Sequence, residues 1–155
     1  MKPLPSQGTD RPRNKSAAIQ LLLRLLAGGV FAVAGGLKIM NPAQFAAAVD
    51  NYRLIPPAWD NLVALTLPWI EVTAGLLVLT GIWLRAAALV IAVLTAGFLL
   101  AIGSALARGL NIECGCFGTA GGRQIGLTSL ALDGILLALA LCLWWPRGHS
   151  DKSVL

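Results

Sequence analysis

The stretch Ala86–Ala107, AAALVIAVLTAGFLLAIGSALA, decides the fold because its 22 residues carry no charge and are all apolar or small. An α-helix rises 1.5 Å per residue, so about 20 apolar residues cross the hydrocarbon core of a bilayer. The whole chain is 57% hydrophobic and 12% charged, whereas a soluble domain is about 25% charged. This stretch therefore predicts a membrane-spanning helix.

Three further stretches of similar length each contain a single charged residue. They are Ser16–Leu37 with Arg24, Asn61–Leu84 with Glu71, and Gln124–Pro146 with Asp133. Four such stretches predict an all-α, polytopic membrane four-helix bundle. We expect the spans at residues 17–39, 61–83, 86–107 and 125–145, within one membrane domain of residues 16–146.

The distribution of positive charge predicts the orientation. Cations gather before the first span, after the second and after the fourth, at Lys2, Arg11, Arg13, Lys15, Arg85, Arg147 and Lys152. In the other two connections, cations are diluted by Asp50, Asp60 and Glu113. The positive-inside rule then places both termini in the cytoplasm, with residues 1–15 as a disordered tail and 147–155 as a short one. The net charge of +5 thus reflects orientation, and we expect no nucleic-acid partner.

The connection before the last span contains Glu113-Cys114-Gly115-Cys116-Phe117-Gly118. In a bacterial inner membrane this loop would face the periplasm, an oxidising compartment in which disulfides form. Gly115 permits the tight turn that would bring the two sulfurs together, and a strained disulfide is easily reduced. The pair can equally hold a soft metal or remain two buried thiols. The third cysteine, Cys142, lies inside the last span and is expected to act as a small apolar residue.

The segment between the first two spans predicts a short amphipathic helix. Asn41-Pro42 is a good helix start, with Asn as the cap and Pro at the first helical position. Apolar residues then follow at helical spacing: Phe45, Ala48, Val49 and Tyr52. We expect this helix to lie on the outer membrane surface or to be tucked over the bundle, and to end before Pro56-Pro57.

Two features of the first span bear on its packing. Gly28, Ala32 and Gly36 are spaced four apart and predict close contact with a neighbouring helix. Arg24 is expected to extend to the cytoplasmic headgroups. A signal-peptide cleavage site at Ala32-Val33-Ala34 is not expected, because Arg24 interrupts the apolar run and the run continues past that tripeptide.

Glu71 and Asp133 are buried charges in the outer half of their spans, roughly 12 to 15 Å below the surface that carries the cysteines. An ionised carboxylate there costs on the order of 3 kcal/mol, so both are expected to face the bundle interior and find partners. Lys38, at the outer end of the first span, is the candidate partner of Glu71. Together they predict a polar pocket that opens outward and passes protons or binds a polar head such as a quinone ring. The alternative is a structural ion pair, or a protonated acid bonded to a neighbour.

Residues between Leu22 and Trp145 resemble the DoxX superfamily of four-helix membrane proteins. The matching residues are Gly36-Leu37-Lys38, Pro42, Phe45, Tyr52, Leu54, Pro56, Pro68, Glu71, Gly75 and Gly81. The run Cys114-Gly115-Cys116-Phe117-Gly118 resembles the MauE branch of methylamine-utilisation membrane proteins. This resemblance implies a thiol–disulfide function on the outer side, with Cys114 and Cys116 as the catalytic pair. It also implies a thioredoxin-like or disulfide-rich periplasmic partner, while DoxX relatives are linked to quinones.

We therefore expect either a thiol–disulfide oxidoreductase or an accessory subunit of one, with Lys38, Glu71, Asp133 and Tyr52 as binding residues. There is one outward cysteine pair and no second pair to relay electrons, which argues against a self-contained oxidase. A non-enzymatic scaffold of a quinone-linked complex is the main alternative. A small transporter or metal-handling protein is a third, although the single histidine, His149, is expected on the opposite side from the cysteines.

Overall fold

The computed structural model describes residues 12–54, 56–110, 112 and 126–145, and within these ranges the chain is helical, with no strand. The helices are α1 (Pro12–Met40), α2 (Pro42–Asn51), α3 (Pro57–Thr80), α4 (Leu84–Ala107) and α5 (Leu127–Trp144). Residues 12–15, expected in the disordered tail, are the first turn of α1, and proline suits this position because its missing N–H would have no partner there.

Four of these helices are long and apolar enough to cross a membrane: Ala17–Met40, Ala58–Thr80, Leu84–Ala107 and Leu127–Trp144. The prediction of an all-α, multi-pass membrane fold is thus confirmed. The second spanning helix begins and ends a few residues earlier than the expected 61–83. It ends at Thr80 because Gly81 adopts a left-handed conformation, with φ +81°, and its N–H bonds the carbonyl of Leu77.

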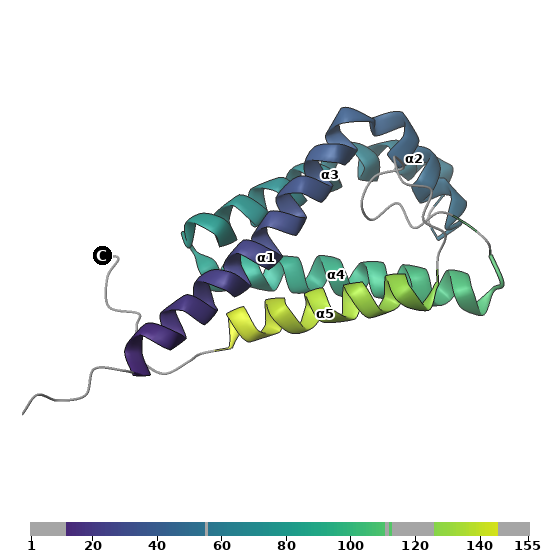
Figure 1. The fold of residues 1–155 in the computed structure, drawn as a ribbon. Coiled ribbons are helices and arrows are strands. Elements are labelled where there is room, and N and C mark those ends of the chain that lie inside the picture. The colour runs from purple at the N-terminus through teal and green to yellow at the C-terminus, as the bar shows by residue number, and fades with distance from the viewer. Residues whose placement is uncertain (1–11, 55, 111, 113–125, 146–155) are drawn as a thin grey trace, which may run out of the picture.

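The four long helices form two pairs, α1 with α3 and α4 with α5 (Figure 1). A turn of residues 81–83 joins α3 to α4, which makes these two helices the link between the pairs. Contact between α1 and α5 is much less extensive than the contact within either pair. The pairs lie close together at one end and separate towards the end that carries α2 (Figure 1), so the bundle is a wedge that is wider at the α2 end.

Helix α2 is tucked over the bundle, the second of the two expected arrangements. It packs mainly on α3, with Phe45 and Ala48 buried. Pro42 occupies the first turn as predicted, but the side chain of Asn41 makes no capping hydrogen bond. Its backbone carbonyl instead accepts from the N–H of Phe45 at 3.2 Å, so α2 is held by the packing of its apolar face.

Close contact between α1 and α3 depends on glycines of both helices. A Cβ on Gly75 would lie 2.6 Å from the backbone nitrogen of Ala32, and one on Gly28 would lie 2.8 Å from the carbonyl oxygen of Gly75. The third contact residue is Gly35, where a Cβ would lie 2.7 Å from the carbonyl oxygen of Pro68. Gly36 was expected at this contact, but a Cβ there would have no atom within 4 Å. Gly35 lies seven residues after Gly28, which in a helix of 3.6 residues per turn places it on nearly the same face. Gly36 lies eight residues after Gly28 and is therefore turned about 80° away from that face.

Arg24 forms hydrogen bonds to the last turn of α3. Its Nε donates to the carbonyl of Val78 at 2.9 Å and its Nη2 to that of Leu79 at 2.8 Å. These carbonyls belong to the last turn of α3, where the helix itself supplies no donors. Arg24 thus caps α3 and fixes the narrow end of the α1–α3 pair.

The Gly35 contact predicts different effects for two adjacent substitutions. Gly35→Ala forces α1 away from the α3 backbone and is expected to reduce stability by about 1–3 kcal/mol, as overpacking does. Gly36→Ala meets open space and is expected to stay within about 0.5 kcal/mol of the parent. Thermal unfolding of both variants in the same detergent checks this, and equal melting temperatures would contradict the assigned contact face.

Candidate functional site

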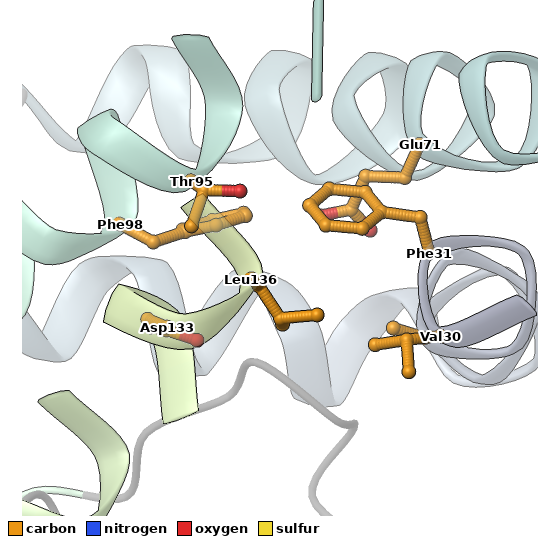
Figure 2. Close-up of a pocket in the computed structure, with 8 residues that line it drawn as sticks. Val30, Phe31, Glu71, Thr95, Phe98, Asp133 and Leu136 are labelled. Atoms are coloured by element: carbon orange, nitrogen blue, oxygen red, sulfur yellow. The ribbon is translucent and has the colours of Figure 1, made fainter. Parts of the chain in front are cut away.

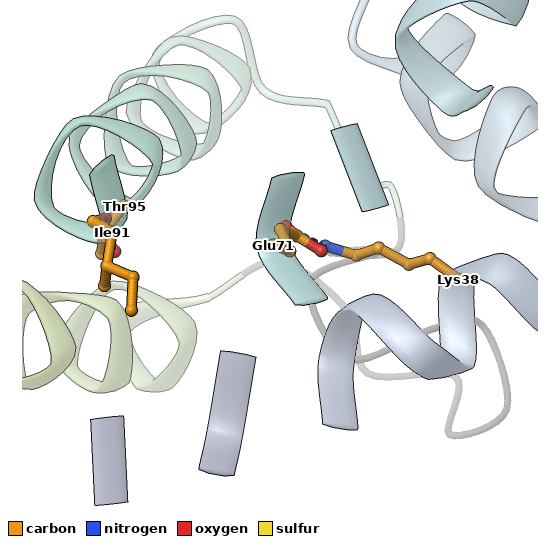
Figure 3. Close-up of polar contacts among 4 residues, drawn as sticks. All are labelled: Lys38, Glu71, Ile91 and Thr95. Atoms are coloured by element: carbon orange, nitrogen blue, oxygen red, sulfur yellow. Dashed lines mark hydrogen bonds and ion pairs between the residues drawn. The ribbon is translucent and has the colours of Figure 1, made fainter. Parts of the chain in front are cut away.

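Lys38 and Glu71 form a buried ion pair between α1 and α3. Lys38 Nζ lies 2.6 Å from Glu71 Oε1 and 2.8 Å from Oε2, and each residue is 1% exposed (Figure 3). Gly35 permits this approach, because a Cβ at that position would lie 3.0 Å from the Cβ of Glu71. The predicted partnership of Lys38 and Glu71 is confirmed.

Two aromatic rings from other helices cover the ammonium group. Lys38 Nζ lies 4.9 Å from the ring centroid of Phe45 in α2 and 4.7 Å from that of Phe98 in α4. An ammonium within about 6 Å of an aromatic centroid is attracted by the negative face of the ring. The pair therefore joins four helices, since α1 and α3 supply the charges while α2 and α4 supply the rings.

A small cavity lies beside the ion pair, between the two helix pairs (Figure 2). Its volume is about 20 Å³, and it is lined by Val30, Phe31, Ala34, Glu71, Thr95, Phe98, Asp133 and Leu136. Glu71 of α3 and Asp133 of α5 therefore line one cavity, as expected, but the surface of this cavity is mostly apolar and not polar as predicted. Asp133 is 5% exposed, so its carboxyl group belongs to the bundle interior.

The cavity is the size of a water molecule and not of an aromatic ring. A void of about 10–15 Å³ admits one water, whereas benzene has been bound in a cavity of about 150 Å³. The residues that line this cavity therefore do not fit a quinone ring. In the described part of the chain, no three His, Cys, Asp or Glu side chains are grouped so that they could hold a metal ion.

Tyr52, the fourth expected binding residue, does not line this cavity. It is the C-terminal cap of α2, and its half-buried side chain packs near Ile102 in α4 and Leu130 in α5. Its backbone carbonyl accepts a hydrogen bond from Arg108 Nη2. Tyr52 thus joins the end of α2 to the end of α4, where Leu130 of α5 also packs.

The segment with Cys114 and Cys116 lies outside the described residues, but the helices on either side of it are described. Arg108 follows the last residue of α4, and Leu130 lies in the first turn of α5. Arg108 bonds the backbone carbonyl of Tyr52, and Leu130 packs against Ile102, against which Tyr52 also packs. The end of α4 and the beginning of α5, which flank this segment in the sequence, therefore lie at the α2 end of the bundle, the end nearer Lys38.

Three residues of the site could not be recognised as site residues from the sequence. Phe45 was expected only as part of an amphipathic face, and Thr95 and Phe98 lie within the uncharged run of α4. Because Thr95 and Phe98 are three residues apart, they occupy the same face of α4. Their role depends on which face of α4 meets the α1–α3 pair, and uniform hydrophobicity does not indicate that face.

The family model of "Methylamine utilisation protein MauE" matches residues 16–146. The chain belongs to the MauE family. Its curated relatives include MauE of Paracoccus denitrificans, 31% identical over 126 residues, which are 78% of this chain and 66% of that protein. MauE of Methylophilus methylotrophus is 30% identical over 124 residues, 79% of this chain and 63% of that protein. The match thus spans about two thirds of each relative, and no solved structure matches this MauE-family chain.

The burial of the ion pair predicts strong coupling between its two members. Lys38→Met leaves a buried carboxylate without its partner and is expected to cost about 3–5 kcal/mol, and Glu71→Leu a similar amount. The double variant removes both charges and is expected to recover most of the loss. Denaturant unfolding of all four proteins gives the coupling energy, and additive losses in the double variant would contradict the buried pair.

Proposed function

We propose that this MauE-family protein is an integral membrane thiol–disulfide redox protein that acts in methylamine utilisation, in the maturation of a periplasmic protein. The observation that carries the proposal is the position of the helix ends beside Tyr52 and Arg108. Both helix ends lie at the α2 end of the bundle, and in the sequence they flank the segment that contains Cys114 and Cys116. The involvement in methylamine utilisation rests on the names of the curated relatives.

The proposed setting is the bacterial inner membrane, with both termini in the cytoplasm and the cysteine segment in the periplasm. Arg24 and Arg85 lie at the end of the bundle opposite α2, because α1 begins there and α3 passes into α4 there. Cations concentrate on the cytoplasmic side of membrane proteins. The α2 end is therefore assigned to the periplasm, where disulfide exchange has an oxidising environment.

The proposed chemistry is thiol–disulfide exchange through a mixed disulfide. A thiolate of the substrate attacks one sulfur of a Cys114–Cys116 disulfide, which breaks that bond and frees the other cysteine as a thiolate. A second substrate thiolate then attacks the mixed disulfide, so that the substrate gains a disulfide and both cysteines end as thiols. Two electrons pass from the substrate to the pair, and the protons of the substrate thiols end on Cys114 and Cys116. A thioredoxin-like protein in its disulfide form accepts these electrons and restores the pair.

A non-enzymatic role as a membrane subunit or scaffold is the second candidate, and one observation favours it. The Lys38–Glu71 pair has both carboxylate oxygens bonded and the ammonium covered by rings. An ion pair with these bonds and ring contacts suits a structural role, in which it holds the helices together. The scaffold role requires Lys38 and Glu71 and makes both cysteines dispensable, whereas the redox role requires the cysteines.

Cysteine substitutions distinguish these two functions. Cys114→Ser and Cys116→Ser are each expected to abolish maturation of the periplasmic partner, because one sulfur cannot both accept and release a substrate disulfide. Cys142→Ser is the matched control, since Cys142 is an exposed thiol within α5, and it is expected to have no effect. The measurements are alkylation trapping of the thiols in cells and the yield of mature partner. Fully reduced cysteines in the parent protein, with normal maturation in both variants, would favour the scaffold role.

A further inference from the structure

Two acidic side chains meet where α2 packs on α3. Asp50 lies one residue before the end of α2, and Asp60 lies in the first turn of α3. Their side chains are in hydrogen-bonding contact, and the charge of Asp50 acts on Asp60. This contact therefore joins the two helices at the α2 end of the bundle.

The two acids differ in their surroundings. Asp60 is 6% exposed, and its Oδ1 is buried without a hydrogen-bond partner among the described residues. Asp50 is exposed. Burial disfavours an ionised carboxylate, and a buried oxygen without a partner costs less when its group is neutral. A proton in this contact therefore belongs on Asp60, whose O–H donates to the carboxylate of Asp50.

The cations at this end of the described bundle are bonded elsewhere or exposed. The helices that pack on α3 are α1, α2 and α4. Lys38 of α1 bonds the Glu71 carboxylate, Arg108 after α4 bonds backbone carbonyls, and Arg53 after α2 is exposed. Two ionised carboxylates in contact repel each other, whereas a single proton between them gives a charge-assisted hydrogen bond.

We propose that Asp50 and Asp60 share one proton and form a pH-sensitive latch that docks α2 on α3. While the proton is present, the hydrogen bond holds the two helices together. When the pH rises and both groups ionise, repulsion replaces the hydrogen bond and α2 loosens. Docking of α2 is therefore favoured at lower pH and is lost as the pH rises.

Helix α2 is short enough for this one contact to matter. It has ten residues, it buries Phe45 and Ala48, and the side chain of Asn41 does not cap it. Phe45 also covers the ammonium group of Lys38, so release of α2 uncovers the ion pair. The latch thus links the pH at the α2 end to the cover of a buried charge, and it does not depend on the proposed thiol chemistry.

Hydrogen–deuterium exchange of the full chain in lipid nanodiscs tests the latch. The measured quantity is the protection of the α2 amides, corrected for the intrinsic exchange rate at each pH. The series runs from about pH 4 to about pH 9, which reaches the upper values known for buried carboxyl groups. In the parent protein this protection is expected to fall at least about tenfold as the pH rises, the effect of losing one hydrogen bond to a charged group. The α4 amides of the same sample are the internal reference and are expected to keep their protection.

Isosteric amides replace the shared proton. Asp60→Asn places an N–H donor where the latch has an O–H, so α2 is expected to stay docked throughout the pH series. In Asp50→Asn the amide donates to an ionised Asp60 and accepts from a protonated one, so the pH dependence is again expected to disappear. Asp151→Asn is the matched control, because it leaves both acids of the latch in place, and it is expected to follow the parent protein.

The pH series of the parent protein needs no substitution, so it decides the proposal even where a variant fails to fold. Three results would overturn the latch: α2 protection that does not change with pH, the parent's pH dependence in Asp60→Asn and Asp50→Asn, or a parallel loss of protection in α4. Loss of α2 protection on removal of Ca²⁺ at constant pH would also overturn it, because the two carboxylates would then hold a cation in place of the proton.

Discussion

The structure depends on one interaction, the ion pair of Lys38 and Glu71. A charge in hydrocarbon is costly, and a bonded partner of opposite sign offsets that cost. The pair forms because Gly35 removes the side chain that would hold α1 away from α3. Phe45 and Phe98 then cover the ammonium group from α2 and α4. One lysine at the end of α1 thereby fixes the positions of three other helices.

The two ends of the α1–α3 pair are held by different chemistry. At the narrow end, Arg24 bonds the last carbonyls of α3, and Gly28 lies against Gly75. At the wide end, the ion pair holds α1 to α3 while the α4–α5 pair diverges. The divergence leaves the water-sized cavity between Glu71 and Asp133. The ion pair, Thr95 and Asp133 therefore lie towards the end of the bundle where α4 ends and α5 begins, which connects the fold to the proposed function.

The sequence was sufficient to predict the spanning helices and the ion pair, because both predictions follow from the cost of placing charge in a membrane. It was insufficient where the outcome depends on which side of a helix meets a neighbour. The four-residue spacing suggested Gly36, although the period of the helix brings Gly35 into contact. Thr95 and Phe98 had no distinguishing signal within an apolar run, and the sequence did not indicate that Tyr52 would contact the end of α4. The roles predicted for Cys114 and Cys116 remain proposals, since that segment lies outside the described residues.

Solid-state NMR of the protein in lipid bilayers tests the ion pair most directly. The chain has four lysines and two glutamates, so labelling lysine with ¹⁵N and glutamate with ¹³C, in a Glu113→Gln background, isolates Glu71. A strong dipolar coupling between a charged Lys38 Nζ and the Glu71 carboxylate carbon is expected, consistent with the N–O distances of 2.6 and 2.8 Å. The absence of this coupling, or a Lys38 nitrogen with the chemical shift of a neutral amine, would contradict the buried ion pair.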